Sequence, residues 1–247
     1  MSVRSFAQNL FQRLGWDVRR TAYPSSEEIL LTRFLTVARP TAVFDVGANV
    51  GQYGLSLRKC GFEGRIVSFE AISSVHARLT TVAAGGGDWI VAPCCALGRA
   101  PGEAHINLAQ NSVSSSLLPM NDAHLKAAPD SRYVATETVR VERLDDIGRP
   151  LLPKDARLLL KVDTQGYEEE VLAGADLVLE SVSAMQLELS IVPLYRGAPS
   201  LRRILELCET LGFQLYGLIP GFYEEKSGRL LQMDGLFLRN DTPQTRD

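Results

Sequence analysis

The segment that most constrains the fold is residues 42–53, AVFDVGANVGQY. It begins with a short run of strand-forming residues that ends at Asp45, and it continues through a loop with glycines at 47 and 51 into a helical pattern. A buried strand, a glycine-containing turn and a helix, in that order, are typical of doubly wound α/β domains, which bind ligands at the carboxyl ends of their parallel strands. The sequence therefore predicts an α/β fold with a pocket at this loop.

The rest of the chain repeats this alternation of strands and helices. Apolar periodicity predicts helices at 53–60, 75–84, 167–173 and 199–211, and strands at 43–46, 65–69, 89–92, 157–162, 185–189, 213–218 and 231–238. Strands separated by helices require right-handed crossovers and a parallel sheet. The last two strands have no helix between them, only a turn around Pro220, Gly221 and Gly228, so we expect one of them to run antiparallel.

Three regions are predicted along the chain. Residues 1–40 form an N-terminal helical extension with helices at 6–14 and 25–39, residues 41–239 form one α/β domain, and residues 240–247 form a flexible tail. A polar stretch at 109–135, between predicted strands at 104–108 and 137–143, is long for a loop in a compact domain, so we expect a lid-like insertion. The apolar face of the N-terminal helices could also pair with a second copy of the chain.

Composition excludes several classes of protein. Hydrophobic residues make up 45% and charged residues 22%, as in an ordinary globular domain. The net charge is −3 and the basic residues are dispersed, which argues against a nucleic-acid partner. No apolar run approaches the ~20 residues of a membrane-spanning helix, and the first residues do not resemble a leader, so we expect a cytoplasmic protein without a membrane span.

The glycine loop and a downstream acid indicate the kind of ligand. Gly47 permits a tight turn, Gly51 lets the helix start close to a ligand, and we expect the loop N–H groups to face that ligand. Asn49 stands where a dinucleotide-binding loop has its second glycine, and together with Asp45 it suits a ligand that carries an amine and a carboxylate. Glu70 follows about 20 residues later at a strand end, where a carboxylate accepts hydrogen bonds from ribose hydroxyls.

These features together resemble the FkbM family of S-adenosylmethionine-dependent methyltransferases. The resemblance covers about residues 41–239 and rests on VFDVGANVGQYG, the strand ending in Glu70, LLLKVDTQGYEEEVL and GRLLQMDGLFLR. It implies a Rossmann-like, seven-stranded class I methyltransferase sheet, mostly parallel with one antiparallel strand and with helices on both faces. It also implies S-adenosylmethionine as cofactor and methyl transfer to a hydroxyl of a sugar, a glycan or a glycosylated secondary metabolite.

The resemblance assigns roles to individual residues. Family members often have Glu and His where this chain has Gln165 and Tyr167, which leaves the roles of those two positions open. The implied cofactor contacts are Glu70 at the ribose, Ala96 and Leu97 at the adenine, and Asp163 facing the methyl group. Around the methionine end they are Asp45, Gly47, Asn49 and Gly51, and Gln52 is a further expected cofactor contact.

Transfer to a sugar hydroxyl benefits from a general base, because the hydroxyl is a poor nucleophile. Asp163, at the end of a buried strand, is the first candidate, with orientation of the cofactor's ammonium as its alternative role. His124, in the long polar stretch, is a second candidate that would have to reach over the pocket; the alternative is a surface histidine. Candidate acceptor contacts are Ser114, Ser115, Tyr195 and Arg196, with loop flexibility or packing as the alternative.

Other chemistries remain open from the residues alone. Asp163, Glu188 and Asp234 could converge on a divalent metal ion, but paired or solvated strand acids are the simpler interpretation, so we predict no metal. A nicotinamide-dependent oxidoreductase is a second function class, against which Asn49 and the lack of a Tyr-x-x-x-Lys pair both argue. A non-catalytic nucleotide-binding partner subunit is a third.

Overall fold

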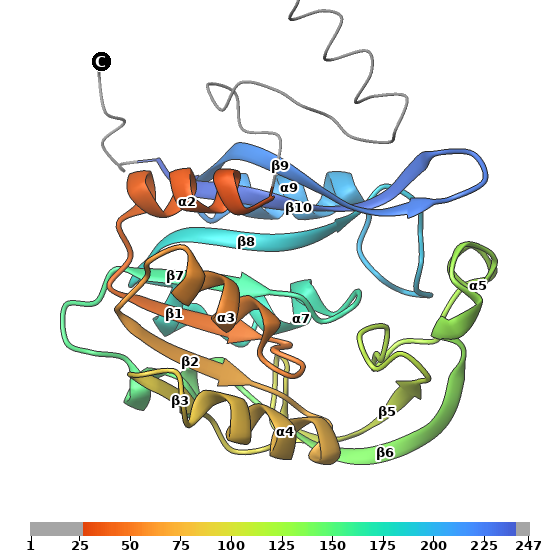
Figure 1. Cartoon of the computed structure of the whole chain (residues 1–247), viewed down its shortest axis with the longest axis horizontal. Helices are drawn as coiled ribbons and strands as arrows, with labels where there is room; N and C mark the ends of the chain where they lie inside the picture. Colours follow the sequence, from red (N-terminus) through yellow and green to blue (C-terminus); the bar gives the residue numbers. More distant parts are fainter. Residues whose placement is uncertain (1–26, 241–247) are drawn as a thin grey trace, which may run out of the picture.

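The computed structural model describes residues 27–240, which form a seven-stranded sheet with helices on both faces and a smaller sheet at one side (Figure 1). The order of the large sheet is β3-β2-β1-β7-β8-β10-β9, and only β10 runs antiparallel to its neighbours. This order and the single reversed strand confirm the predicted class I methyltransferase sheet. The strands are β1 (Ala42–Val46), β2 (Arg65–Phe69), β3 (Trp89–Val91), β7 (Leu158–Val162), β8 (Val182–Ser190), β9 (Phe213–Glu224) and β10 (Arg229–Arg239).

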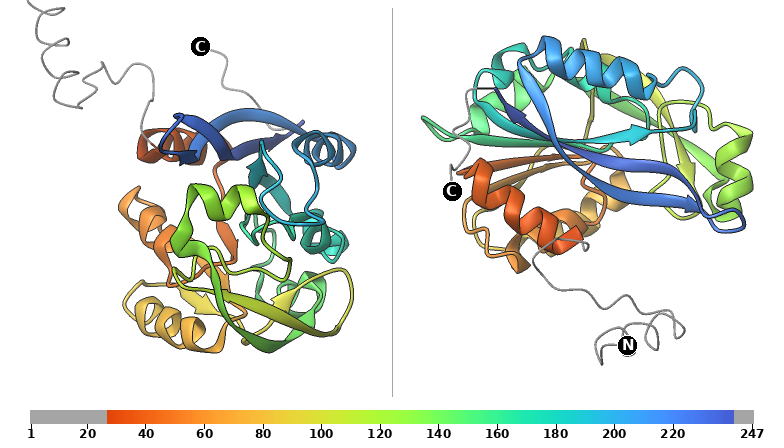
Figure 2. Two further views of the ribbon diagram at one scale, coloured as in Figure 1. Left: turned by 90° about the vertical axis from the view of Figure 1, so that its right-hand side faces the viewer. Right: turned by 90° about the horizontal axis from the view of Figure 1, so that it is seen from above.

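Helices cover both faces of the large sheet. Successive residues of a strand point to opposite faces, and apolar strand residues on each face pack against helices. Val43 and Leu159 pack against α2 (Glu27–Ala38), α3 (Gln52–Lys59) and α4 (Ser73–Ala83). Phe44 and Leu160 face the other side, where they meet the second helical layer (Figure 2). That layer contains α6 (Leu144–Ile147), η2 (Arg149–Leu151), α7 (Glu168–Leu172), α8 (Asp176–Leu179) and α9 (Leu201–Thr210).

The C-terminal hairpin differs from the prediction in one respect. β9 continues through Pro220 and Gly221 to Glu224, so the turn lies at residues 225–228 and not around Pro220. Pro220 has no N–H to donate, but β9 is an edge strand, where a missing donor leaves no partner unpaired. The pairing with β10 also shifts register beside Pro220, as expected where a proline interrupts the ladder.

The smaller sheet carries the lid-like insertion. Its order is β4-β6-β5, with β4 (Ala96–Leu97), β5 (Gly102–Ala109) and β6 (Tyr133–Glu142). The insertion connects β5 to β6 and contains α5 (Asp122–Ala127) and η1 (Pro129–Ser131). Met120 forms a bridge with Tyr195, and the Asn121 N–H donates to the Leu194 carbonyl at 2.8 Å. These contacts hold the insertion against the segment that follows β8.

Part of the N-terminal extension packs on the domain itself. In α2, Phe34 is fully buried and its ring lies 5.7 Å from that of Tyr216 on β9. The apolar face of this helix is therefore covered by the chain's own sheet, and pairing with a second copy through the N-terminal helices stays a prediction. The predicted helix at 6–14 and most of the predicted tail lie outside the described residues. Within residues 27–240, every helix is too short or too polar to cross a membrane.

Candidate active site

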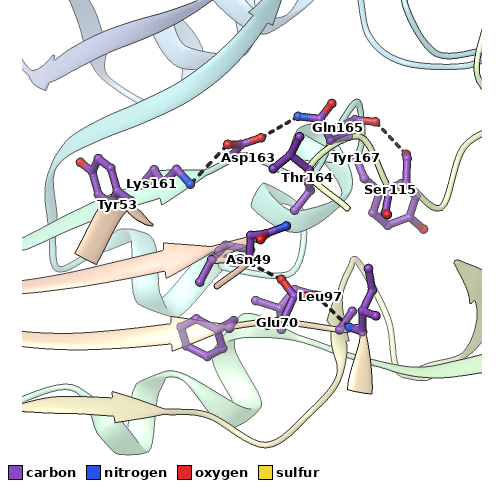
Figure 3. Close-up of a pocket in the computed structure, with 18 of the residues that line it drawn as sticks. Asn49, Tyr53, Glu70, Leu97, Ser115, Lys161, Asp163, Thr164, Gln165 and Tyr167 are labelled. Carbon is purple, nitrogen blue, oxygen red and sulfur yellow. Dashed lines mark hydrogen bonds and ion pairs between the residues drawn. The ribbon is translucent and has the colours of Figure 1, made fainter. Parts of the chain in front are cut away.

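A cavity of about 280 Å³ opens at the carboxyl ends of β1, β2 and β7 (Figure 3). Asp163, directly after β7, lies between three groups of lining residues. The first group follows β1, β2 and β3 and includes Asn49, Glu70, Ile72, Ala96 and Leu97. The second belongs to the lid-like insertion and includes Ser112, Val113, Ser115 and Ser116. The third includes Glu27, Gln52, Tyr53, Ser56, Lys161, Gln186 and Asp234.

The two loop glycines are required by packing. Gly47 has φ +76°, and a Cβ there would lie 1.9 Å from the Asp163 carbonyl oxygen, so only glycine lets the loop approach the end of β7. Gly51 has φ +91° and begins α3. A Cβ on Gly51 would meet Leu79 and Trp89 at 3.1 and 3.2 Å, and the residue does not line the cavity. The implied contact between Gly51 and a cofactor is therefore corrected to a packing role.

The N–H groups of the loop do not face the cavity, contrary to our prediction. Asn49 adopts a left-handed conformation with φ 47°, which folds the loop back on itself and on the end of β2. As a result, every N–H from residue 47 to 51 has an internal acceptor: Gly47 and Ala48 donate to the Phe69 carbonyl (both 3.0 Å), Asn49 to Glu70 Oε2 (2.9 Å), Val50 to Asn49 Oδ1 (2.8 Å) and Gly51 to the Ala48 carbonyl (2.9 Å).

Glu70 is held in the cavity wall by the backbone. Its Oε2 accepts from the Asn49 N–H and its Oε1 accepts from the Ile72 N–H at 2.8 Å, and the residue is 7% exposed. Burial raises the pKa of Glu70, and these hydrogen bonds oppose that rise. Each oxygen keeps a lone pair, so the carboxylate suits two neighbouring hydroxyls of a ribose. Ala96 and Leu97 are buried in the adjacent wall, which suits an aromatic base.

A row of polar side chains crosses the sheet under α2 and α3. Lys161 on β7 pairs in register with Asp45 on β1 and with Gln186 on β8, and its Nζ lies 3.1 Å from Asp45 Oδ1 and 3.3 Å from Asp163 Oδ2. Gln186 Nε2 donates to Asp234 Oδ2 on β10 at 2.9 Å. Gln186 Oε1 accepts from the hydroxyl of Tyr53 on α3 at 2.8 Å. We call Asp45, Tyr53, Lys161, Gln186 and Asp234 the polar row.

Sequence reasoning did not assign Lys161 or Gln186 to the site. The available signal was a charged or amide side chain inside an otherwise apolar strand, LLLKV in β7 and AMQL in β8. Burial lowers the pKa of Lys161, but Asp45 and Asp163 more than offset this, so the pKa is raised and the ammonium stays charged. Such buried ions are rare unless they are paired.

Asp45 does not contact the cavity, which corrects its implied role at the methionine end of a cofactor. The residue is fully buried and does not line the cavity. Burial raises its pKa and Lys161 opposes that rise. Although Nζ is close, no donor is aligned with either Asp45 oxygen as a hydrogen bond. Asp45 therefore acts as the counter-charge that allows Lys161 to be buried beside the cavity.

Gln165 connects the cavity to the lid-like insertion. Its Nε2 donates to Asp163 Oδ1 at 2.8 Å and to both carboxylate oxygens of Glu188 at 2.9 Å. Its Oε1 accepts from the Tyr195 hydroxyl at 2.6 Å, and its carbonyl accepts from Ser116 Oγ at 2.8 Å. The Asp163 side chain is 34% exposed and lines the cavity. One amide thus orients Asp163 and binds two segments that are remote in sequence.

Three of the four expected acceptor contacts lie outside the cavity wall. Tyr195 is 1% exposed and donates to Gln165 and to the Ser114 carbonyl at 3.2 Å, so its ring cannot stack on a sugar. Ser114 is buried within the insertion, and Arg196 is exposed away from the cavity. Packing of the insertion on the segment after β8 produces this burial. Ser115 does line the cavity, as do Ser112 and Ser116.

His124 is not placed over the cavity. It lies on α5, is buried, and packs between Tyr195 and Phe222, with ring centroids 5.2 and 5.3 Å away. Its Nδ1 has no hydrogen-bond partner, and burial lowers the pKa of His124 to about 4. Because His124 does not line the cavity, its assignment as a candidate base is corrected to packing between the insertion and the C-terminal hairpin.

The three acids considered as metal ligands do not form a cluster. Both oxygens of Glu188 accept from Gln165, one oxygen of Asp234 accepts from Gln186, and Lys161 occupies the side of Asp163 that faces the sheet. Burial raises the pKa of Glu188 well above its usual range and that of Asp234 to about 6. In the part of the chain that the structure describes, no three His, Cys, Asp or Glu side chains are arranged to hold a metal ion.

Comparison with known proteins identifies the family. The methyltransferase FkbM domain model matches residues 45–215, well over half of the chain. No curated protein matches the chain. Among solved structures, cofactor-bound Rv0187 from MTB is similar at 15% identity over 97% of this chain and 91% of that chain, with a TM-score of 0.47. A TehB-like SAM-dependent methyltransferase from Corynebacterium glutamicum is similar at 11% identity over 96% and 97%, with a TM-score of 0.42.

The family match decides for a methyltransferase and against the alternative of a nicotinamide-dependent oxidoreductase. Its boundaries include the glycine loop, Glu70, Ala96 and Leu97, and the TQG turn after Asp163. The cavity fits the expected cofactor at its ribose and adenine ends, where a buried carboxylate with spare lone pairs adjoins an apolar wall. The chain therefore belongs to the FkbM family of methyltransferases, and its methyl donor is S-adenosylmethionine.

Proposed function

We propose that this methyltransferase transfers the methyl group to a hydroxyl oxygen of a sugar, a glycan or a glycosylated secondary metabolite. The observation that carries the proposal is the setting of Asp163, a partly exposed carboxylate in the cavity wall. The polar side chains of the lining near it that are free of charge are four hydroxyls and one amide, which donate to and accept from a polyol. They are Ser112, Ser115, Ser116, Thr164 and Gln165.

The chemistry asks little of the protein beyond alignment and proton removal. S-adenosylmethionine, when bound, supplies a methyl group already activated on a sulfonium. The protein must hold the acceptor oxygen in line and exclude water, and the lid-like insertion in the cavity wall suits both tasks. Asp163 accepts the proton that the hydroxyl loses, while the Gln165 amide fixes the carboxylate at 2.8 Å.

The site of methylation tests this proposal directly. The purified chain is incubated with S-adenosylmethionine labelled with ¹³C in its methyl group and with a panel of neutral hexosides, deoxyhexosides and glycosylated macrolides. A labelled methoxy signal in the NMR spectrum of a product is the expected result. Label on nitrogen, carbon or sulfur would contradict O-methylation. Cofactor binding without turnover of any glycoside would instead favour the non-catalytic partner subunit.

Glu70→Gln is expected to weaken binding of S-adenosylhomocysteine by about 10- to 100-fold, because a charged hydrogen-bond acceptor for the ribose is lost. The side-chain NH2 of the new glutamine would also face one of the two backbone N–H groups that now donate to the carboxylate, and two donors repel each other. Isothermal titration calorimetry gives the affinity, and Glu103→Gln, at an exposed strand position outside the cavity, is the matched control. Unchanged affinity in Glu70→Gln would remove this residue from the ribose site.

A further inference from the structure

Four members of the polar row, all except the fully buried Asp45, form a separate wall of the cavity. In Figure 3, Tyr53 and Lys161 lie on the side of Asp163 away from Gln165 and Ser115, and away from Glu70 and Leu97. Gln186 and Asp234 extend this wall, because Gln186 is hydrogen-bonded to both Tyr53 and Asp234. The cavity therefore has a polar side that neither the adenosine contacts nor the hydroxyl-rich insertion uses.

This wall presents the ammonium of Lys161 and the carboxylate of Asp234, and Glu27 adds a second carboxylate to the cavity lining near Asp234. Lys161 is the single basic side chain among the described residues that line the cavity, and it is 7% exposed. Its Nζ lies within ion-pair distance of Asp45 and Asp163, and an ammonium has three N–H donors, so one remains for a ligand. Asp234 gives one oxygen to Gln186 and, within residues 27–240, has no hydrogen bond at the other. The first turn of α3 begins beside them at Gln52 without a side-chain cap.

A ligand matched to this wall carries an anion and a cation close together. The α-carboxylate and α-ammonium of an amino acid have this character, whereas ribose and adenine do not. The glycine loop cannot take the carboxylate, because its N–H groups from residue 47 to 51 are already occupied. The insertion side of the cavity offers neutral hydroxyls and apolar side chains. The polar row is thus the part of the cavity with matching charges.

We propose that the polar row recognises the amino-acid end of the cofactor, with Lys161 binding the α-carboxylate and Asp234 binding the α-ammonium. Tyr53 and Gln186 are positioning residues, since their hydrogen bonds orient Asp234. Asp45 is a positioning residue for Lys161. This assignment leaves Asp163 available to the acceptor. It rests on the cofactor of the family and not on the proposed acceptor, so its test requires no methyl transfer.

Two ligands isolate the amino-acid end. S-adenosylhomocysteine contains it, and 5′-methylthioadenosine keeps the adenosine and the sulfur but lacks it. By calorimetry, the unmodified chain is expected to bind S-adenosylhomocysteine more tightly. Asp234→Asn should weaken S-adenosylhomocysteine by about tenfold or more and change 5′-methylthioadenosine by less than about twofold. Glu103→Gln, at an exposed position outside the cavity, is the control and should leave both affinities within about twofold. Asp163→Asn tests whether Asp163 binds the α-ammonium instead of Asp234.

Several results would overturn the assignment. The first is equal affinity of the unmodified chain for the two ligands. The second is an Asp234→Asn variant that loses the same affinity for both ligands, or loses none for either. The third is an Asp163→Asn variant that loses affinity for S-adenosylhomocysteine alone. If Asp234→Asn fails to fold, Tyr53→Phe serves in its place, because it removes only the hydroxyl that donates to Gln186. That variant should weaken S-adenosylhomocysteine selectively, by about threefold or more, and an unselective effect would count against the proposal.

Discussion

Asp163→Asn is expected to lower kcat for methyl transfer by about 10²- to 10⁴-fold, the range typical for loss of a positioned general base. The asparagine keeps the shape of the side chain and can still accept from Gln165, but it cannot take a proton from the acceptor hydroxyl. We expect the affinity for S-adenosylhomocysteine to stay within about twofold, so the loss should appear in turnover and not in cofactor binding. Steady-state kinetics with a labelled methyl donor, combined with calorimetry, separates the two quantities.

The control for this variant is Asp146→Asn, an exposed acid on α6 outside the cavity, which should leave kcat unchanged. Turnover of Asp163→Asn at the rate of the unmodified chain would show that alignment alone drives the reaction. A drop in turnover that tracks a drop in cofactor affinity would place Asp163 at the ammonium instead, the alternative that its sequence position left open.

Lys161→Met is expected to lower the free energy of unfolding by about 3–5 kcal/mol, because Asp45 would remain buried without its counter-charge. The double variant Asp45→Asn/Lys161→Met removes both charges and should recover much of this loss. Urea denaturation at pH 7 measures all three proteins and closes a double-mutant cycle with Asp45→Asn. Equal losses in Lys161→Met and in the double variant would show that the pair is not the source of the effect.

The pH dependence of this variant gives a second check. The pKa of Asp45 is already raised by burial, and removal of Lys161 takes away the main influence that lowers it. An acid whose folded-state pKa is raised stabilises the fold below its unfolded pKa and loses that contribution as the pH rises through the folded value. The deficit of Lys161→Met should therefore shrink as the pH falls toward about 4, close to the unfolded pKa of an aspartate. A deficit that is independent of pH would contradict this explanation.

The sequence alone was sufficient for the α/β fold class, and the family resemblance carried by its motifs supplied the seven-stranded sheet and the cofactor. These signals are local: the strand, glycine loop and helix at residues 42–53 are adjacent in the chain, and the alternation of strands and helices predicts a parallel sheet. The absence of a helix between the last two strands predicted that one of them is antiparallel, and the pairing shows that it is β10. Glu70 and Asp163 follow buried strands, and the carboxyl ends of parallel strands share one edge of a sheet, so both lie in the cavity wall.

Tertiary structure alone decided which polar groups reach the cavity. Asp45 and Lys161 are more than a hundred residues apart, and only the register between β1 and β7 makes them an ion pair that keeps Asp45 away from a ligand. His124 and Tyr195 are buried because the insertion packs on the segment after β8. Hydrogen bonding in the loop likewise depends on where β2 ends. Local pattern specifies each element, whereas the contacts of a polar side chain depend on the register and packing of elements distant in sequence.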